Sequence, residues 1–140
     1  HPFRVCMILR HVFKVSDEEV LAAAVLHDTI EDTTTDRDDL IEHFGGRVAG
    51  WVSLLSKDKR MEGPACEADY MRKLKYSPLA VRLIKLADVY DNLTDAATVP
   101  SGAGRKEAIM KASRYLAALK IKNGEINKLL REIKYFSAQG

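Results

Sequence analysis

Apolar residues recur at intervals of three and four positions along most of this chain, a spacing typical of helices that bury one face. Over the first twelve residues the spacing is kept by Phe3, Met7, Ile8 and Val12. The same pattern predicts further helices over residues 16–30, 35–44, 48–56, 65–75, 77–93, 105–122 and 125–137. No stretch alternates apolar and polar residues in the manner of a strand, so the predicted fold class is all-α.

Polar residues, glycine and proline at the predicted helix ends indicate where each helix begins or stops. The segment Ser16–Glu19 has the form of a capping box, and Thr35 with an aspartate three residues later offers a second cap. The glycines at 45 and 46 suit a helix C-terminus. Ser77 and Pro78 predict an N-cap and a first-turn proline for the long helix that follows. Residues 100–104 are expected to form a flexible break.

Length and composition narrow the class of protein. The chain has 140 residues, of which 46% are hydrophobic and 30% charged, so we expect one folded domain spanning residues 1–140. No apolar run is long enough to cross a bilayer, and we expect no membrane partner. The two cysteines, Cys6 and Cys66, form no CxxC pair, which favours a cytoplasmic protein without a disulfide framework.

The net charge of +2 is unevenly distributed along the chain. Residues 1–100 contain 13 Lys and Arg against 17 Asp and Glu, whereas residues 101–140 contain 9 against 3. The basic end is either an ordinary solvated face of the last helices or a wall that helps to hold a small polyanionic ligand. Nucleic acid is not expected as a partner, because the basic residues are not interleaved with aromatic residues for base stacking.

The segment with the sequence HDTIED, at residues 27–32, has the strongest chemical signal. It places His27, Asp28, Glu31 and Asp32 at the end of an alanine-rich apolar helix. Burial of ionisable groups is costly unless they are paired or bind a metal. A solvated acidic helix end would explain Glu31 and Asp32, but it explains less well the histidine and aspartate that follow the apolar stretch.

Two further positions supply groups of the same chemical type. Asp88 follows an apolar turn in the segment LIKLAD, and Asn92 lies one turn later on the same face. Taken alone, Asp88 would more simply pair with a core arginine or cap a neighbouring helix, and His1 alone indicates almost nothing. Together with His27 and Asp28, however, they make a mixed nitrogen and oxygen set that suits a borderline divalent metal such as Mn, Fe, Co or Zn.

These residues resemble the H…HD…D signature of the HD superfamily of metal-dependent phosphohydrolases. HDTIED at 27–32, HFGGRV at 43–48 and KLADVYDNL at 85–93 resemble the (p)ppGpp hydrolase domain of RelA/SpoT-type enzymes and the stand-alone small alarmone hydrolases. The resemblance implies a compact HD-domain helical bundle that uses Glu31 and Asp32 to handle the attacking water. It also implies one bound Mn²⁺, with other divalent metals possible, and these metal ligands: His1, His27, Asp28 and Asp88.

The resemblance also implies substrate contacts for Asn92, Lys59 and Arg105, although each of the two cations could equally be a solvated surface charge. The family usually has helices before its first metal-binding histidine, and these are missing from this chain. Many relatives carry a basic residue where this chain has Val89, and a tyrosine where it has Ile109. These departures affect the expected nucleotide preference more than the expected metal site.

The function predicted from the sequence is metal-dependent removal of pyrophosphate from the 3′ position of a guanine nucleotide, (p)ppGpp. Two alternatives remain open at this point. One is an HD phosphohydrolase that acts on another nucleotide, and the other is a catalytically silent module that binds alarmone. The pair Glu31 and Asp32 favours an active hydrolase, because a silent module has no chemical need for both carboxylates beside a complete ligand set.

Overall fold

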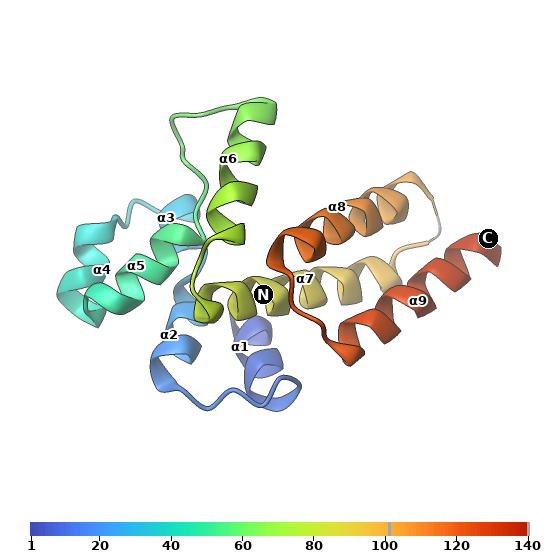
Figure 1. The fold of residues 1–140 in the computed structure, drawn as a ribbon, viewed down its shortest axis with the longest axis horizontal. Helices are drawn as coiled ribbons and strands as arrows, with labels where there is room; N and C mark the ends of the chain where they lie inside the picture. Colours follow the sequence, from blue (N-terminus) through green and yellow to red (C-terminus); the bar gives the residue numbers. More distant parts are fainter. Residues whose placement is uncertain (101, 140) are drawn as a thin grey trace.

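The computed structural model describes residues 1–100 and 102–139, and within them it has nine helices and no strand (Figure 1). The all-α prediction is therefore confirmed. The helices are α1 (Pro2–His11), α2 (Glu18–Leu26), α3 (Thr29–Asp32), α4 (Arg37–Phe44), α5 (Gly46–Leu54), α6 (Gly63–Lys75), α7 (Leu79–Thr98), α8 (Ala103–Leu119) and α9 (Gly124–Gln139). None of these helices combines the length and apolarity needed to span a membrane.

Helix α7 is the centre of the bundle. Figure 1 shows it running through the middle of the molecule, with α8 along one side and α1 along the other. It also contacts α2, α5, α6 and α9. Its buried apolar side chains include Val81, Ile84, Leu86 and Leu93, and each such side chain contributes about 1.5–3 kcal/mol through removal from water. A polar residue on α7 is therefore held in a fixed place by packing on several sides.

The predicted helix over residues 16–30 is wrong in one respect, because it is broken in two. Helix α2 ends at Leu26 and α3 begins at Thr29. At the break, His27 Nδ1 lies 2.6 Å from the carbonyl oxygen of Ala24, and the Thr29 hydroxyl donates to the carbonyl of Leu26 at 2.7 Å. These side chains take carbonyls that a continuous helix would bond through its backbone, so the helix stops there. The break separates His27 and Asp28 from the acidic residues of α3.

The cap residues differ from the predicted ones by a single position. Asp17, not Ser16, caps α2, since its carboxylate accepts from two backbone amides of the first turn. Asp36, not Thr35, caps α4 through a capping box with Asp39. An aspartate competes for these amides more effectively than the neighbouring hydroxyl, because its acceptor carries charge.

Several helix boundaries also differ from the prediction. Gly45 ends α4 as expected, at φ 88°, but α5 begins already at Gly46. Ser77 does not cap α7; its hydroxyl donates instead to the carbonyl of Lys73, and Pro78 takes the N-cap position. Helix α7 continues beyond Leu93 to Thr98, and α8 starts at Ala103, inside the predicted break. Ser101 lies outside the described residues.

Candidate active site

Three predicted metal ligands from distant parts of the sequence converge on one point. His1 precedes α1, His27 follows α2, and Asp88 lies in the middle of α7. One nitrogen or oxygen atom from each of them lies within 4.8 Å of the others. His27 is 3% exposed and Asp88 is 6% exposed, so two of the three are buried. Packing of α1 and α2 on α7 therefore assembles the group.

His1 is held through both of its ring nitrogens. Nε2 lies 2.7 Å from an oxygen of Asp88, and Nδ1 lies 2.5 Å from an oxygen of Asp91. These two carboxylates, Asp88 with the larger effect, raise the pKa of His1 against the opposing influence of burial. The His1 and His27 rings meet edge to face, with 5.4 Å between their centroids.

His27 presents one nitrogen to the site and uses the other to fix its ring. Nδ1 donates to the carbonyl of Ala24, so Nε2 is the nitrogen that faces the site. Nε2 is buried without a hydrogen-bond partner, 3.2 Å from an oxygen of Asp28 and 3.6 Å from one of Asp88. A buried nitrogen without a partner between two carboxylates is uncommon in a folded protein. This donor set fits a divalent metal ion.

Charge strongly perturbs the same residues. Burial lowers the pKa of His27, but the carboxylates of Asp28 and Asp88 outweigh burial and raise it to about 10. The neighbouring His27 in turn lowers the pKa of Asp28. Asp28, the fourth predicted ligand, lies beside the cluster with its side chain about one-third exposed, so it is the ligand closest to solvent.

A largely buried lysine, which no local sequence pattern marks as a site residue, balances Asp88. The amino group of Lys85 lies 2.7 Å from the second oxygen of Asp88, one turn away on α7. It also lies over the ring of Tyr115, at 4.3 Å from the centroid, and near that of Tyr70, at 5.3 Å. The spacing of three residues on a predicted helix was the one available signal for this pair.

Asp88 is therefore ionised although it is buried. Burial alone would raise its pKa, but His1, His27 and Lys85 lower the pKa far below its ordinary range. Burial opposes the charge of Lys85, but Asp88, Tyr70 and Tyr115 together outweigh burial and raise the pKa of Lys85. The site consequently holds a buried, ionised carboxylate beside the two histidines.

The two predicted catalytic carboxylates lie on α3, at the wall of a cavity that the predicted metal ligands also line. The cavity has a volume of about 270 Å³, and both Glu31 and Asp32 line it together with the metal-ligand residues. Glu31 accepts a short hydrogen bond from the backbone amide of Lys57, which fixes its carboxylate. The amino group of Lys57 lies 2.5 Å from Glu67. The loop after α5 thus positions an acidic residue of α3.

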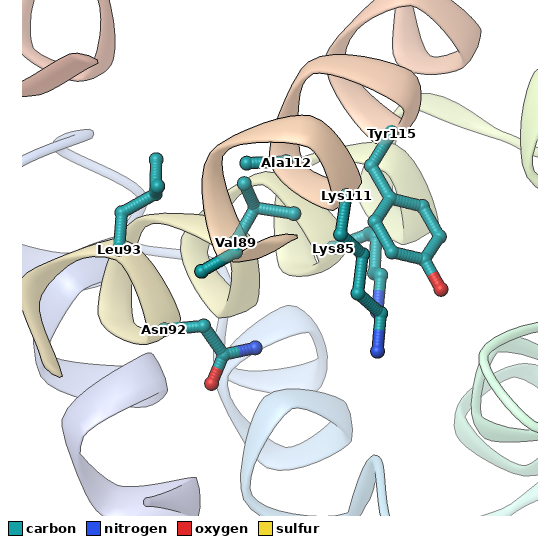
Figure 2. Close-up of a pocket in the computed structure, with 8 residues that line it drawn as sticks. Lys85, Val89, Asn92, Leu93, Lys111, Ala112 and Tyr115 are labelled. Atoms are coloured by element: carbon teal, nitrogen blue, oxygen red, sulfur yellow. The ribbon is translucent and has the colours of Figure 1, made fainter. Parts of the chain in front are cut away.

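Asn92 also lines this cavity, and it connects the cavity with a second one. The second cavity, of about 280 Å³, lies between α7 and α8 (Figure 2). Its floor is apolar and includes Val89 and Leu93, whereas Lys85, Asn92, Lys111 and Tyr115 border both cavities. Figure 2 shows the Lys111 and Lys85 amino ends and the Tyr115 hydroxyl gathered on one side. Lys111 was not predicted, because nothing in the sequence distinguishes it from other exposed lysines of α8.

The other two predicted substrate residues lie away from the metal-ligand cluster. The Lys59 amino group is 3.5 Å from the carbonyl of Thr33 and lines a neighbouring cavity of about 440 Å³, which meets the site cavity at Lys57. Arg105 is 8% exposed, and its guanidinium donates to the carbonyls of Ala97 and Val99. The structure does not bring Arg105 to the site; the side chain instead joins the start of α8 to the end of α7.

With this site and fold, the chain belongs to the HD domain family, whose sequence profile matches residues 1–116. The chain is similar to guanosine-3′,5′-bis(diphosphate) 3′-pyrophosphohydrolase MESH1. The Mus musculus protein is 31% identical over 137 residues, which cover 95% of this chain and 76% of that protein. The Danio rerio protein is 34% identical over the same shares. GTP pyrophosphokinase rsh of Brucella ovis is 37% identical over 99 residues, covering 66% of this chain but 13% of the longer protein.

Solved structures agree with this family. One, described as a metazoan ortholog of SpoT that hydrolyses ppGpp, superimposes with a TM-score of 0.82 at 32% identity, covering all of this chain and 80% of that one. A protein from Listeria monocytogenes EGD-e has a TM-score of 0.75 at 23% identity, a likeness that shows the fold alone. The predicted HD-domain helical bundle is confirmed.

Proposed function

We propose that this chain hydrolyses guanosine 3′,5′-bis(diphosphate) and its pentaphosphate analogue at the 3′ position, releasing pyrophosphate and GDP or GTP. The relatives with this printed activity align over most of the chain. The observation that carries the proposal is the convergence of His1, His27 and Asp88 around an unpartnered buried nitrogen, at a cavity also lined by Glu31 and Asp32. We propose further that residues 1–140 act as one hydrolase domain, located in the cytoplasm, where both cysteines stay free.

The metal site of the proposal consists of His1, His27 and Asp88, with Asp28 as the fourth ligand. A divalent cation, Mn²⁺ in our proposal with other ions possible, supplies a bound water of lowered pKa to this site. The mixed histidine and carboxylate set suits Mn²⁺ better than Mg²⁺, which is usually held by oxygen ligands alone. Buried Asp88, kept anionic by His1, His27 and Lys85, offers a charged oxygen to such a cation.

Glu31 and Asp32 orient the attacking water and accept its proton in this proposal. A carboxylate acts as a general base only when it is held within reach of the proton that it removes. The Lys57 amide holds Glu31 at the cavity wall, and Asp32 follows on the same short helix. Water attacks the phosphorus bonded to the ribose 3′ oxygen, and the bond to that oxygen breaks. The 3′ oxygen takes up the proton that the water lost and becomes a hydroxyl, while the two phosphates are released together as pyrophosphate.

The nucleotide occupies the cavity between α7 and α8 in our proposal. Its apolar floor suits a base or ribose face, and Asn92 and Lys111 at its border suit hydroxyl and phosphate oxygens. Lys59 meets the substrate from the neighbouring cavity. Arg105 supports this arrangement from a distance, since it fastens α8 to α7.

Comparison of nucleotides tests the substrate directly. The purified protein with Mn²⁺ should hydrolyse ppGpp faster than nucleoside monophosphates or dinucleotides that lack a 3′-pyrophosphate. An HD phosphohydrolase for another nucleotide is the second candidate, and the observation that favours it is the apolar Val89 in the lining of the nucleotide cavity. Faster turnover of a nucleotide without a 3′-pyrophosphate would replace our proposal with this one.

A further inference from the structure

His1, the first histidine of the site, is hydrogen-bonded through Nδ1 to a carboxylate that has no part in the proposed reaction. Asp91 lies 2.5 Å from Nδ1 of His1, while Nε2 of the same ring faces Asp88. Asp91 is only 3% exposed and lies three residues after Asp88 on α7. One imidazole ring therefore joins two buried carboxylates of a single helix, one at each nitrogen.

Asp91 is itself held by a cation from α1. Nε of Arg4 donates to both oxygens of Asp91, at 2.9 and 3.2 Å, and Nη2 of Arg4 donates to Asp95 at 3.1 Å. A buried carboxylate is costly unless it is paired, and Asp91 has two partners that can carry positive charge. Because Arg4 and His1 both belong to the start of α1, Asp91 also fixes that helix end against α7.

We propose that Asp91 is a positioning residue for the metal, which fixes His1 with a proton on Nδ1 and the lone pair of Nε2 toward the cation. A carboxylate in this place orients the ring, selects the tautomer and makes the ligand nitrogen more basic. Asp91 has the same role for His1 that the Ala24 carbonyl has for His27. The inference rests on the metal site of the proposed function, but not on the identity of the substrate.

Replacement of Asp91 by asparagine tests the inference through metal affinity. The amide keeps the size of the side chain but removes its charge, so Asp91→Asn should weaken Mn²⁺ binding about 10–100-fold, as loss of such partners does in other metal sites. The Mn²⁺ dissociation constant can be measured from the electron paramagnetic resonance of free Mn²⁺. Asp95→Asn is the matched control: it removes the same charge one turn further along α7, where the side chain is 64% exposed and bonded to Arg4. Its affinity should stay within about twofold of the parent.

A thermal readout separates positioning from a general loss of stability. Saturating Mn²⁺ raises the Tm of any protein that binds it in the folded state. At one fixed Mn²⁺ concentration this increase should shrink in Asp91→Asn and persist in Asp95→Asn, whatever the Tm of each variant in chelator. If Asp91→Asn does not fold, Arg4→Gln, at a side chain 55% exposed, should weaken Mn²⁺ binding in the same direction.

The outcomes distinguish this inference from the proposed function. Parental Mn²⁺ affinity in Asp91→Asn, or in Arg4→Gln where only that variant folds, would overturn the role of Asp91 and leave the hydrolase proposal intact. Failure of the parent protein to bind Mn²⁺ would overturn both. A parent that binds Mn²⁺ but does not hydrolyse ppGpp would overturn the substrate alone.

Discussion

At the scale of single residues, each histidine of the site is oriented by a hydrogen bond from the ring nitrogen that points away from the site. The Ala24 carbonyl fixes Nδ1 of His27, and Asp91 bonds Nδ1 of His1. In both rings Nε2 then faces the carboxylate of Asp88. The same two nitrogens, together with an anion kept charged by Lys85, make a site prepared for a cation before any cation binds.

Because Asp88 and Glu31 have different proposed roles, their substitution by alanine should have different effects. Asp88→Ala removes a member of the cluster, so we expect it to abolish both metal binding and turnover. Glu31→Ala should reduce turnover about 10²–10⁴-fold, the usual contribution of a general base, while one Mn²⁺ per chain stays bound. Elemental analysis beside a rate assay checks both results. Full Mn²⁺ stoichiometry in Asp88→Ala would show that the ligand assignment is wrong.

The sequence could predict some of these residues and not others. The structure brings His1, His27 and Asp88 together, as the family resemblance implies, although their binding of a metal remains a prediction. Asp91 and Lys111 could not be identified, because their importance comes from which helices pack together and not from a local pattern. Arg105 shows the reverse case, since the family resemblance implied a substrate contact whereas its guanidinium donates to backbone carbonyls.

At the scale of elements, the break between α2 and α3 is what shapes the site. At the break, the Ala24 carbonyl accepts from the ring of His27 as well as from its backbone amide, which fixes the ring at the end of α2. The sequence predicted helix at this place because its apolar pattern continues to Ile30. Side chains that compete for backbone carbonyls end helices without changing that pattern, so periodicity alone could not locate the break.

Helix α4, which follows the site, gives a direct test of the observed caps. Asp36→Ala removes the side-chain acceptor for the Asp39 amide but keeps the backbone amide that donates to the Asp39 carboxylate, and it should lower the free energy of unfolding by about 1 kcal/mol. Thr35→Ala, at the residue that the sequence pattern favoured, should change it much less. Urea unfolding of both variants measures the difference. Equal losses, or a larger loss at Thr35, would contradict the cap seen in the structure.

At the scale of the whole molecule, α7 connects the functional parts. One face carries Lys85, Asp88 and Asn92 toward the metal-ligand cavity, and the same helix forms the floor of the α8 cavity. The sequence predicted this helix and its all-α surroundings because helical periodicity is strong over long segments. The family resemblance implied a substrate contact for Arg105 of the α8 segment, but the α8 residues that border the site are Lys111 and Tyr115. That difference is decided by how α8 packs on α7, across a long separation in sequence. Part of the net positive charge of residues 101–140 lies at the site, because Lys111 lines both cavities.

Release of pyrophosphate from ppGpp, measured with and without added Mn²⁺, tests the central claim most directly. The proposed site requires both a cation and the carboxylates of α3, so the reaction should occur only with the metal. We predict one pyrophosphate for each GDP formed, and no release in the presence of excess chelator. No pyrophosphate from ppGpp while Mn²⁺ is demonstrably bound would contradict the account.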